Sequence, residues 1–178
     1  MYSTENVPAL WVNRTGRAAW KGMLNVQRTI LIALGILAAA LILASIVFRY
    51  FLNLPLMWVE ELCLYLIFWY YIAGASYATY DRSHIRGGVI DIILKDRPKI
   101  LSGFHAGASL VCLGLSCLLA VWSYYDFVWN LGLDSRTTKL FLPIAWAHLS
   151  LTVGFILMVV YFFSESVDSL RSVKRGAL

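Results

Sequence analysis

Three charged side chains stand close together in a chain that is otherwise poor in charge. Arg49 ends one hydrophobic run, and Glu60 and Glu61 begin the next one after a short turn. Charged side chains at the edge of a bilayer extend to water or pair with a neighbouring helix. We therefore expect Arg49 to pair with Glu60 or Glu61, or the carboxylates to meet a basic residue of another subunit. Ordinary boundary charges without a fixed partner are the alternative.

Other residue combinations that could support catalysis are scarce. The sequence has no nucleotide-binding glycine motif, no paired metal-ligand spacing and no nucleophile motif. Cys63, Cys112 and Cys117 all fall inside hydrophobic stretches, where cysteine is commonly a small packing residue. We therefore expect the protein not to be an enzyme, and to need no cofactor or metal ion.

The composition indicates which elements must position the charges. Of 178 residues, 60% are hydrophobic and 14% are charged, and the mean hydropathy is +0.71. Four stretches each reach the roughly 20 residues that a helix needs to cross about 30 Å of hydrocarbon. The sequence thus predicts an all-α integral membrane protein, with a membrane domain over 29–164. Its four transmembrane helices are expected at about 29–49, 59–80, 100–125 and 140–164.

Lysine and arginine are distributed unevenly among the polar segments. Twelve of them lie before the first span, between the second and third, or after the fourth, and three lie in the other two connections. The positive-inside rule therefore predicts a cytoplasmic N-terminal segment (1–28), a cytoplasmic loop (81–99) and a cytoplasmic tail (165–178). Because this pattern accounts for the net charge of +5, no nucleic-acid partner is expected.

Two of the cytoplasmic segments carry apolar residues at helical spacing. In 1–28, Trp20, Met23 and Leu24 fall on one side, together with Gln27, which favours a short interfacial helix. A disordered tail with an aromatic anchor is the alternative. The loop 81–99 has a similar pattern and predicts a second short amphipathic helix, with a solvated loop as the alternative.

Small residues inside the spans predict close helix contacts. Gly74 lies in a run of small residues in the second span, which is otherwise rich in aromatic residues. Its bulky side indicates packing on protein as well as lipid, with lipid alone as the alternative. The third span has Gly103-x-x-x-Gly107, a spacing that lets helix backbones approach each other in membranes.

The histidines allow one alternative function to be weighed, that of a haem-bearing or quinone-linked membrane anchor for a redox enzyme. Histidines on facing helices can ligate haem, and His105 and His148 lie in the third and fourth spans. Counted from the predicted cytoplasmic ends, however, they differ in depth by about eleven residues, or roughly 16 Å. Because this separation is too large for one iron, each histidine is expected to be satisfied by a neighbouring helix.

The most specific pattern runs from residue 48 to residue 86. Phe48-Arg49-Tyr50-Phe51 precedes Pro55-Leu56-x-Trp58-x-Glu60-Glu61-Leu62, Gly74-Ala75 and His84-Ile85-Arg86. With the four spans, this resembles the DctQ-like small membrane subunit of tripartite ATP-independent periplasmic (TRAP) transporters. The second half resembles it in hydropathy and around Pro143-x-x-Trp146. The candidate structural or interface residues are Arg49, Trp58, Glu60, Glu61, Gly74, His84, Arg86, Gly103 and Gly107.

The resemblance implies a complex in the bacterial inner membrane. A periplasmic substrate-binding protein would deliver an organic acid or similar solute, and a large subunit would move it with sodium ions by an elevator motion. The small subunit would brace the stationary part, so its partners would be the large subunit, the binding protein and membrane lipids. A stand-alone transporter is the other alternative, but the two halves of this chain show no internal repeat of the kind common in such proteins.

Overall fold

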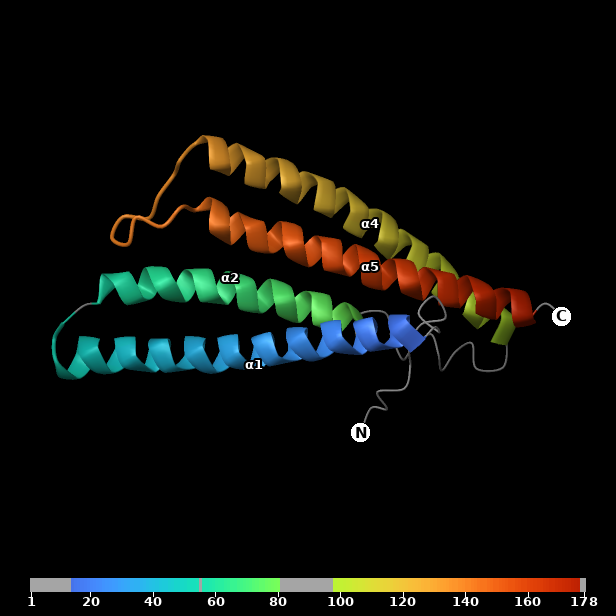
Figure 1. Ribbon diagram of the computed structural model, residues 1–178, viewed down its shortest axis with the longest axis horizontal. Coiled ribbons are helices and arrows are strands. Elements are labelled where there is room, and N and C mark those ends of the chain that lie inside the picture. Colours follow the sequence, from blue (N-terminus) through green and yellow to red (C-terminus); the bar gives the residue numbers. More distant parts are fainter. Residues whose placement is uncertain (1–13, 55, 81–97, 177–178) are drawn as a thin grey trace.

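Four long helices make up nearly all of the structure. The computed structural model describes residues 14–54, 56–80 and 98–176. The helices are α1 (Arg14–Phe51), α2 (Met57–Tyr80), α4 (Pro98–Gly132) and α5 (Ala145–Gly176), as Figure 1 shows. Each is long and apolar enough to cross a membrane. The predicted all-α fold with four membrane-spanning helices is therefore confirmed.

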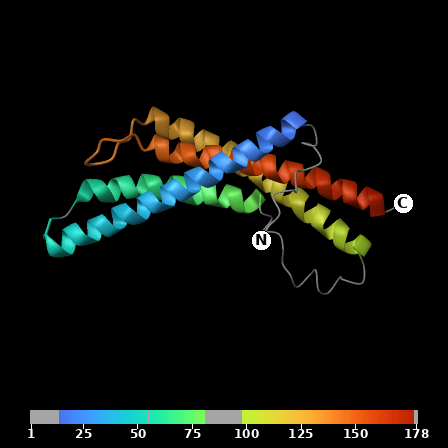
Figure 2. The same ribbon diagram turned by 60° about the horizontal axis from the view of Figure 1, so that its bottom comes forward.

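The helices pack as two antiparallel hairpins that meet between α2 and α5. The main contacts run from α1 to α2, from α2 to α5 and from α5 to α4. In the most apolar stretch of α5, 39% of the residues are buried, whereas in that of α1 only 6% are buried. Figure 2 shows α1 crossing the other helices at an angle, so that its N-terminal half lies near α5. Thus α5 is the centre of the packing, and α1 lies at its edge.

The helices extend beyond the predicted spans. α1 runs without a break through residue 28, so 14–28 are its first turns and not a separate interfacial helix. The physical reason is that Trp20 and Gln27 are buried in the protein, at 3% and 7% exposure, and do not lie on a membrane surface. α5 likewise continues through most of the predicted tail, to Gly176. The second predicted amphipathic helix, in 81–99, lies outside the described residues except for its last two, which begin α4.

Both described connections lie at the same end of the molecule, here called the outer end because the charge distribution predicts it to face outward (Figure 1). Between α1 and α2, the Leu54 N–H donates to the Phe48 carbonyl at 3.1 Å. The longer α4–α5 connection folds back on itself. In it the Thr137 N–H donates to the Leu142 carbonyl, and the Ile144 N–H donates to the Ser135 carbonyl, each at 2.9 Å. This pairing gives the connection a defined shape.

Candidate functional site

Arg49 pairs with Glu60 at the outer end. The guanidinium nitrogen and carboxylate oxygen are 3.4 Å apart, and the side chains are 58% and 52% exposed. An exposed pair of this kind stabilises a protein by only about 0–1 kcal/mol. Each residue is also favoured by its helix dipole, since Arg49 lies in the last turn of α1 and Glu60 in the first turn of α2. The pair therefore orients the ends of the two helices more than it stabilises them.

Glu61 binds the α4–α5 connection and not Arg49. Its carboxylate accepts hydrogen bonds from the backbone N–H groups of Lys139 and Leu140, each at 2.9 Å. Hydrogen bonds to an ionised acceptor are roughly twice as strong as neutral ones. The two adjacent glutamates thus make different contacts. Glu60 joins α2 to α1, and Glu61 joins α2 to the hairpin of α4 and α5.

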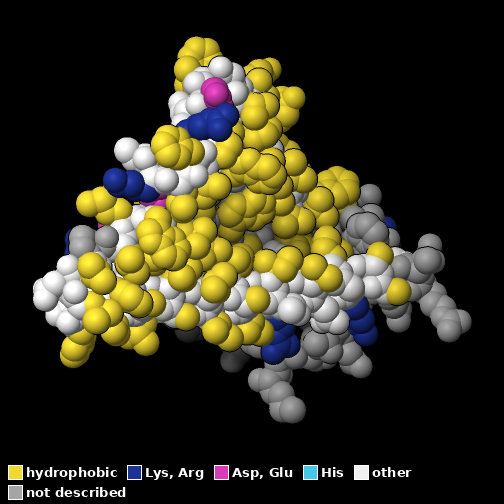
Figure 3. Space-filling model, turned by 60° about the vertical axis from the view of Figure 1, so that its left-hand side comes forward, with side chains coloured by type: hydrophobic (Ala, Val, Ile, Leu, Met, Phe, Trp, Pro, Cys, Tyr) yellow, Lys and Arg dark blue, Asp and Glu magenta, His cyan; other side chains and the backbone are white. Residues whose placement is uncertain are grey.

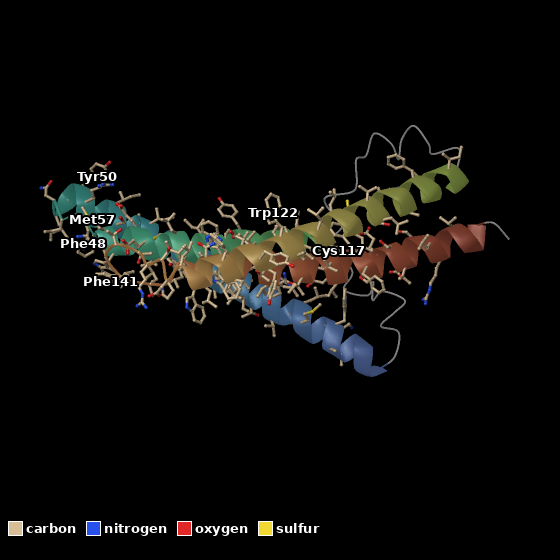
Figure 4. All side chains as sticks on the ribbon, turned by 90° about the horizontal axis from the view of Figure 1, so that it is seen from above. Phe48, Tyr50, Met57, Cys117, Trp122 and Phe141 are labelled. Atoms are coloured by element: carbon tan, nitrogen blue, oxygen red, sulfur yellow. The ribbon has the colours of Figure 1, made fainter. Side chains whose placement is uncertain are left out.

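Tyr65, one turn further along α2, holds the same connection. Its hydroxyl donates to the carbonyl of Pro143 at 3.0 Å. Between the two contacts lies Phe141, whose φ of 52° is unusual for a bulky residue. Phe141 is 67% exposed, and Figure 4 shows it at the outer end. We call Glu61, Tyr65 and residues 137–143 the outer clasp, because α2 fixes the connection on both sides of its strained residue.

Replacing Glu61 by alanine should loosen the outer clasp. The backbone N–H groups of Lys139 and Leu140 would lose their acceptor, so the α4–α5 connection would lose one of its ties to α2. Cleavage of the α4–α5 connection by a soluble protease, followed on the purified chain, should become faster. The matched variant Glu60→Ala removes the neighbouring carboxylate from an exposed pair and should leave the cleavage rate nearly unchanged. Equal rates for the two variants would contradict the division of labour between the glutamates.

A buried polar cluster joins three helices near the other end, here called the inner end. The Gln27 amide donates to the Ser76 hydroxyl at 2.6 Å and to the Ala73 carbonyl at 3.1 Å. The Tyr161 hydroxyl donates to the Gln27 amide oxygen. Trp20 covers the cluster, with its ring centroid 5.5 Å from that of Tyr161. Through this inner cluster of Trp20, Gln27, Ser76 and Tyr161, α1 is fastened to α2 and α5.

Sequence reasoning missed the inner cluster. It placed Gln27 in a surface segment, because the hydrophobic run begins two residues later. The sequence did carry one signal of it. Gln27 is a lone amide directly before an apolar run, and it falls on the same side of the helix as Trp20. Such a group is costly to bury unless it is hydrogen-bonded, so it marks a contact with polar partners on other helices.

Asp126 and His148 form a second pair that the sequence did not reveal. The His148 Nδ1 atom bonds to the Asp126 carboxylate between α5 and α4. Asp126 escaped notice because the predicted third span ended at residue 125. Since Asp126 is level with His148, His105 lies 21 residues away along α4, about 30 Å. The separation of about 16 Å that the sequence predicts for the two histidines is too short, because α4 and α5 extend beyond the predicted spans.

The separation of His105 and His148 tests the alternative that the protein is a haem-bearing membrane anchor. Two rings separated by about 30 Å along the helices cannot ligate one iron. Within residues 14–54, 56–80 and 98–176, no group of three or more histidine, cysteine, aspartate or glutamate side chains is placed to hold a metal ion. The geometry of the described histidines therefore gives the haem-anchor reading no support.

The glycines divide into packed and unpacked ones. A Cβ atom built on Gly103, Gly107 or Gly114 of α4 would meet no atom of the described residues within 4 Å. By contrast, a Cβ on Gly154 of α5 would lie 1.9 Å from the Cγ2 atom of Ile72. Gly154, which the sequence analysis did not single out, thus marks the closest approach of α5 and α2 among the glycine contacts. The α4 glycines are not packed by any residue in the described part of the chain.

The remaining candidate residues lie apart from one another. Trp58 is 46% exposed at the outer end, near the Arg49–Glu60 pair. Gly74 faces α1, where a Cβ atom would be 3.8 Å from Leu31, an ordinary contact. His84 and Arg86 lie outside the described residues. Among the described candidates, the charged ones thus lie together at the outer end, and Gly103 and Gly107 lie on a face of α4 that no described residue packs against.

Comparison with known proteins gives one family. Residues 21–172 match the profile of the family described as tripartite ATP-independent periplasmic transporters, DctQ component. The match covers all four helices except the first turns of α1 and the last turn of α5. No curated protein matches the chain.

Proposed function

Because this chain belongs to the DctQ family of tripartite ATP-independent periplasmic transporter components, we propose that it braces the transporter's large membrane subunit. In this proposal, the large subunit moves an organic acid or similar solute with sodium ions, after a periplasmic binding protein has delivered it. The complex lies in the inner membrane of a bacterium. The chain itself is a multi-pass membrane protein with four apolar helices.

The row of open glycines on α4 carries the proposal. Gly103, Gly107 and Gly114 fall within about 40° of one another around the helix, because four and seven residues are close to whole numbers of turns. Lipid tails can cover apolar side chains, but small residues are enriched where membrane helices approach each other. We therefore assign this face of α4 to a helix of the large subunit. Cys117 and Trp122, labelled on α4 in Figure 4, are also exposed.

The placement of charge also supports a bracing role. Figure 3 shows hydrophobic side chains over most of the side seen there, with few charged ones among them. In the described spans, the acidic residues Glu60, Glu61 and Asp126 lie near the outer end and are bonded within the chain. Glu165 and Asp168 lie toward the inner end of α5, and they too have interaction partners. Sodium sites need oxygen ligands that are available to the ion. The proposal accordingly assigns the ion and solute sites to the large subunit.

Replacing Gly107 by leucine should weaken the complex without harming the fold. The added Cβ atom would meet no described atom within 4 Å, so we expect the melting temperature of the isolated chain to stay the same. In the complex it would hold a partner helix away, and overpacking of about 1–3 kcal/mol corresponds to a loss of roughly 5- to 150-fold in affinity. The measurement is the amount of large subunit that copurifies with the tagged chain in detergent.

Gly22→Leu is the matched control. Gly22 is also an exposed helical glycine with no atom within 4 Å of a built Cβ, but it lies on α1. We expect this variant to copurify with the large subunit as the unaltered chain does. Undiminished copurification by both Gly107→Leu and Gly103→Leu would show that the α4 face is not the interface.

A further inference from the structure

An apolar groove runs between α1 and α2 inside the membrane-spanning region. Its volume is about 840 Å³, and its walls include Leu31 and Gly35 from α1 and Tyr70, Gly74 and Tyr77 from α2. This volume lies within the roughly 300–1,000 Å³ typical of small-molecule sites. At Gly35 the two walls lie close together, because a built Cβ atom there would be 3.1 Å from the Tyr70 ring. A groove of this size and lining has room for a flexible hydrocarbon chain.

Two basic side chains lie on α1 in line with the groove, toward the N-terminus of the helix. Lys21, Arg28 and Gly35 are spaced seven residues apart, and residues at that spacing drift by only about 20° around a helix. Arg28 therefore projects from the same side of α1 as the residues that line the groove. Lys21 and Arg28 are exposed, and neither forms an ion pair with a carboxylate in the described part of the chain.

Arg28 also lies at the depth expected for lipid phosphates. It is 21 residues from Arg49, which is about 30 Å along the helix and close to the thickness of the hydrocarbon core. With Arg49 at the outer edge, Arg28 is near the opposite edge, which the positive-inside rule predicts to be cytoplasmic. The groove begins one turn further into the membrane, where acyl chains lie.

We propose that this groove holds an acyl chain of an anionic phospholipid whose headgroup binds Arg28 and Lys21. The alternative occupant, a helix of a partner protein, is disfavoured by charge. Helix ends on the cytoplasmic side carry an excess of lysine and arginine, which would face the two basic residues of α1. An anionic headgroup complements them. The proposal concerns a lipid site of this chain and does not depend on its role in transport.

The test measures lipid binding to the purified full chain by native mass spectrometry in detergent. The probes are dioleoylphosphatidylglycerol, which is anionic, and dioleoylphosphatidylcholine, which is not. We expect the anionic lipid to bind more tightly to the unaltered chain. Because a basic residue near a membrane surface contributes about 1 kcal/mol to binding anionic lipid, Arg28→Gln should weaken binding of the anionic lipid about fivefold. It should leave phosphatidylcholine binding unchanged.

Two further variants separate a site from general attraction. Arg171→Gln removes the same charge from an exposed position on α5 and should leave binding of both lipids unchanged. Ile36→Trp places a bulky ring in the groove and should weaken binding of both lipids. Equal binding of the two lipids, or equal losses for Arg28→Gln and Arg171→Gln, would overturn the proposal. Disulfide cross-linking of an Ile36→Cys variant to a cysteine of a partner helix would also overturn it, because a protein would then occupy the groove.

Discussion

Replacing Gly154 by alanine is expected to destabilise the packing of α2 on α5 by about 1–3 kcal/mol. The new Cβ atom would lie 1.9 Å from the Cγ2 atom of Ile72 and 3.5 Å from the Ile72 carbonyl oxygen. Isoleucine in a helix has one strongly preferred χ1 rotamer, so its methyl group cannot easily turn away. The helices must therefore separate, and α5 is the centre of the packing. A lowered melting temperature of the purified chain is the expected observation.

The Ile72→Ala variant provides the matching test. It removes the methyl group that would clash, so the double variant Gly154→Ala/Ile72→Ala should be more stable than the sum of the two single effects predicts. Residues in direct contact show such coupling, usually of about 0.5–3 kcal/mol. Gly107→Ala is the control, because its Cβ atom would meet nothing within 4 Å. Additive effects, or an equal shift for Gly107→Ala and Gly154→Ala, would contradict the packing described.

Replacing Gln27 by leucine is expected to release the inner half of α1 from α2 and α5. The Tyr161 hydroxyl would lose its acceptor in a site where the tyrosine is only 2% exposed. A buried polar group left without a partner costs about 1–3 kcal/mol. Ser76 keeps its second bond, to the Ala73 carbonyl at 2.9 Å, so the loss falls mainly on Tyr161. Hydrogen exchange should accelerate in the N-terminal half of α1, which has few other buried contacts.

Two variants make this expectation specific. Tyr161→Phe removes the group that would be orphaned, so adding it to Gln27→Leu should restore part of the lost protection. Asn25→Leu alters an exposed amide two residues away and should not change exchange in α1. If Asn25→Leu and Gln27→Leu accelerate exchange to the same extent, the inner cluster does not fasten α1.

The sequence was enough to predict four helices. In a bilayer, the backbone N–H and C=O groups of a long apolar run find hydrogen-bond partners within the run itself only when it is helical. The sequence could not predict where the helices end. Residues that flank an apolar run remain helical when a neighbouring helix covers them, as Trp20 and Gln27 show before the first run. Asp126 was missed for the same reason, since it lies in α4 beyond the predicted span and its partner is on α5.

The charged candidates show a different limit. The sequence placed Arg49 near both Glu60 and Glu61, but adjacent residues on a helix point about 100° apart. Which one faces α1 depends on how α2 is rotated about its axis, and α2 packs against both α1 and α5. The glycines show the same limit. Gly103-x-x-x-Gly107 has the spacing of a packing motif, yet neither glycine is packed by the described residues. Gly154 is packed although it belongs to no Gly-x-x-x-Gly pair. Spacing identifies a possible contact, and only the tertiary arrangement decides which contacts form.

Sodium-driven solute uptake into proteoliposomes tests the bracing role most directly. The vesicles would contain the large membrane subunit with or without this chain, together with the binding protein loaded with its labelled solute. We expect uptake only when both membrane subunits are present, and none when this chain is reconstituted alone. Uptake by this chain alone, or equal uptake by the large subunit without it, would contradict the account.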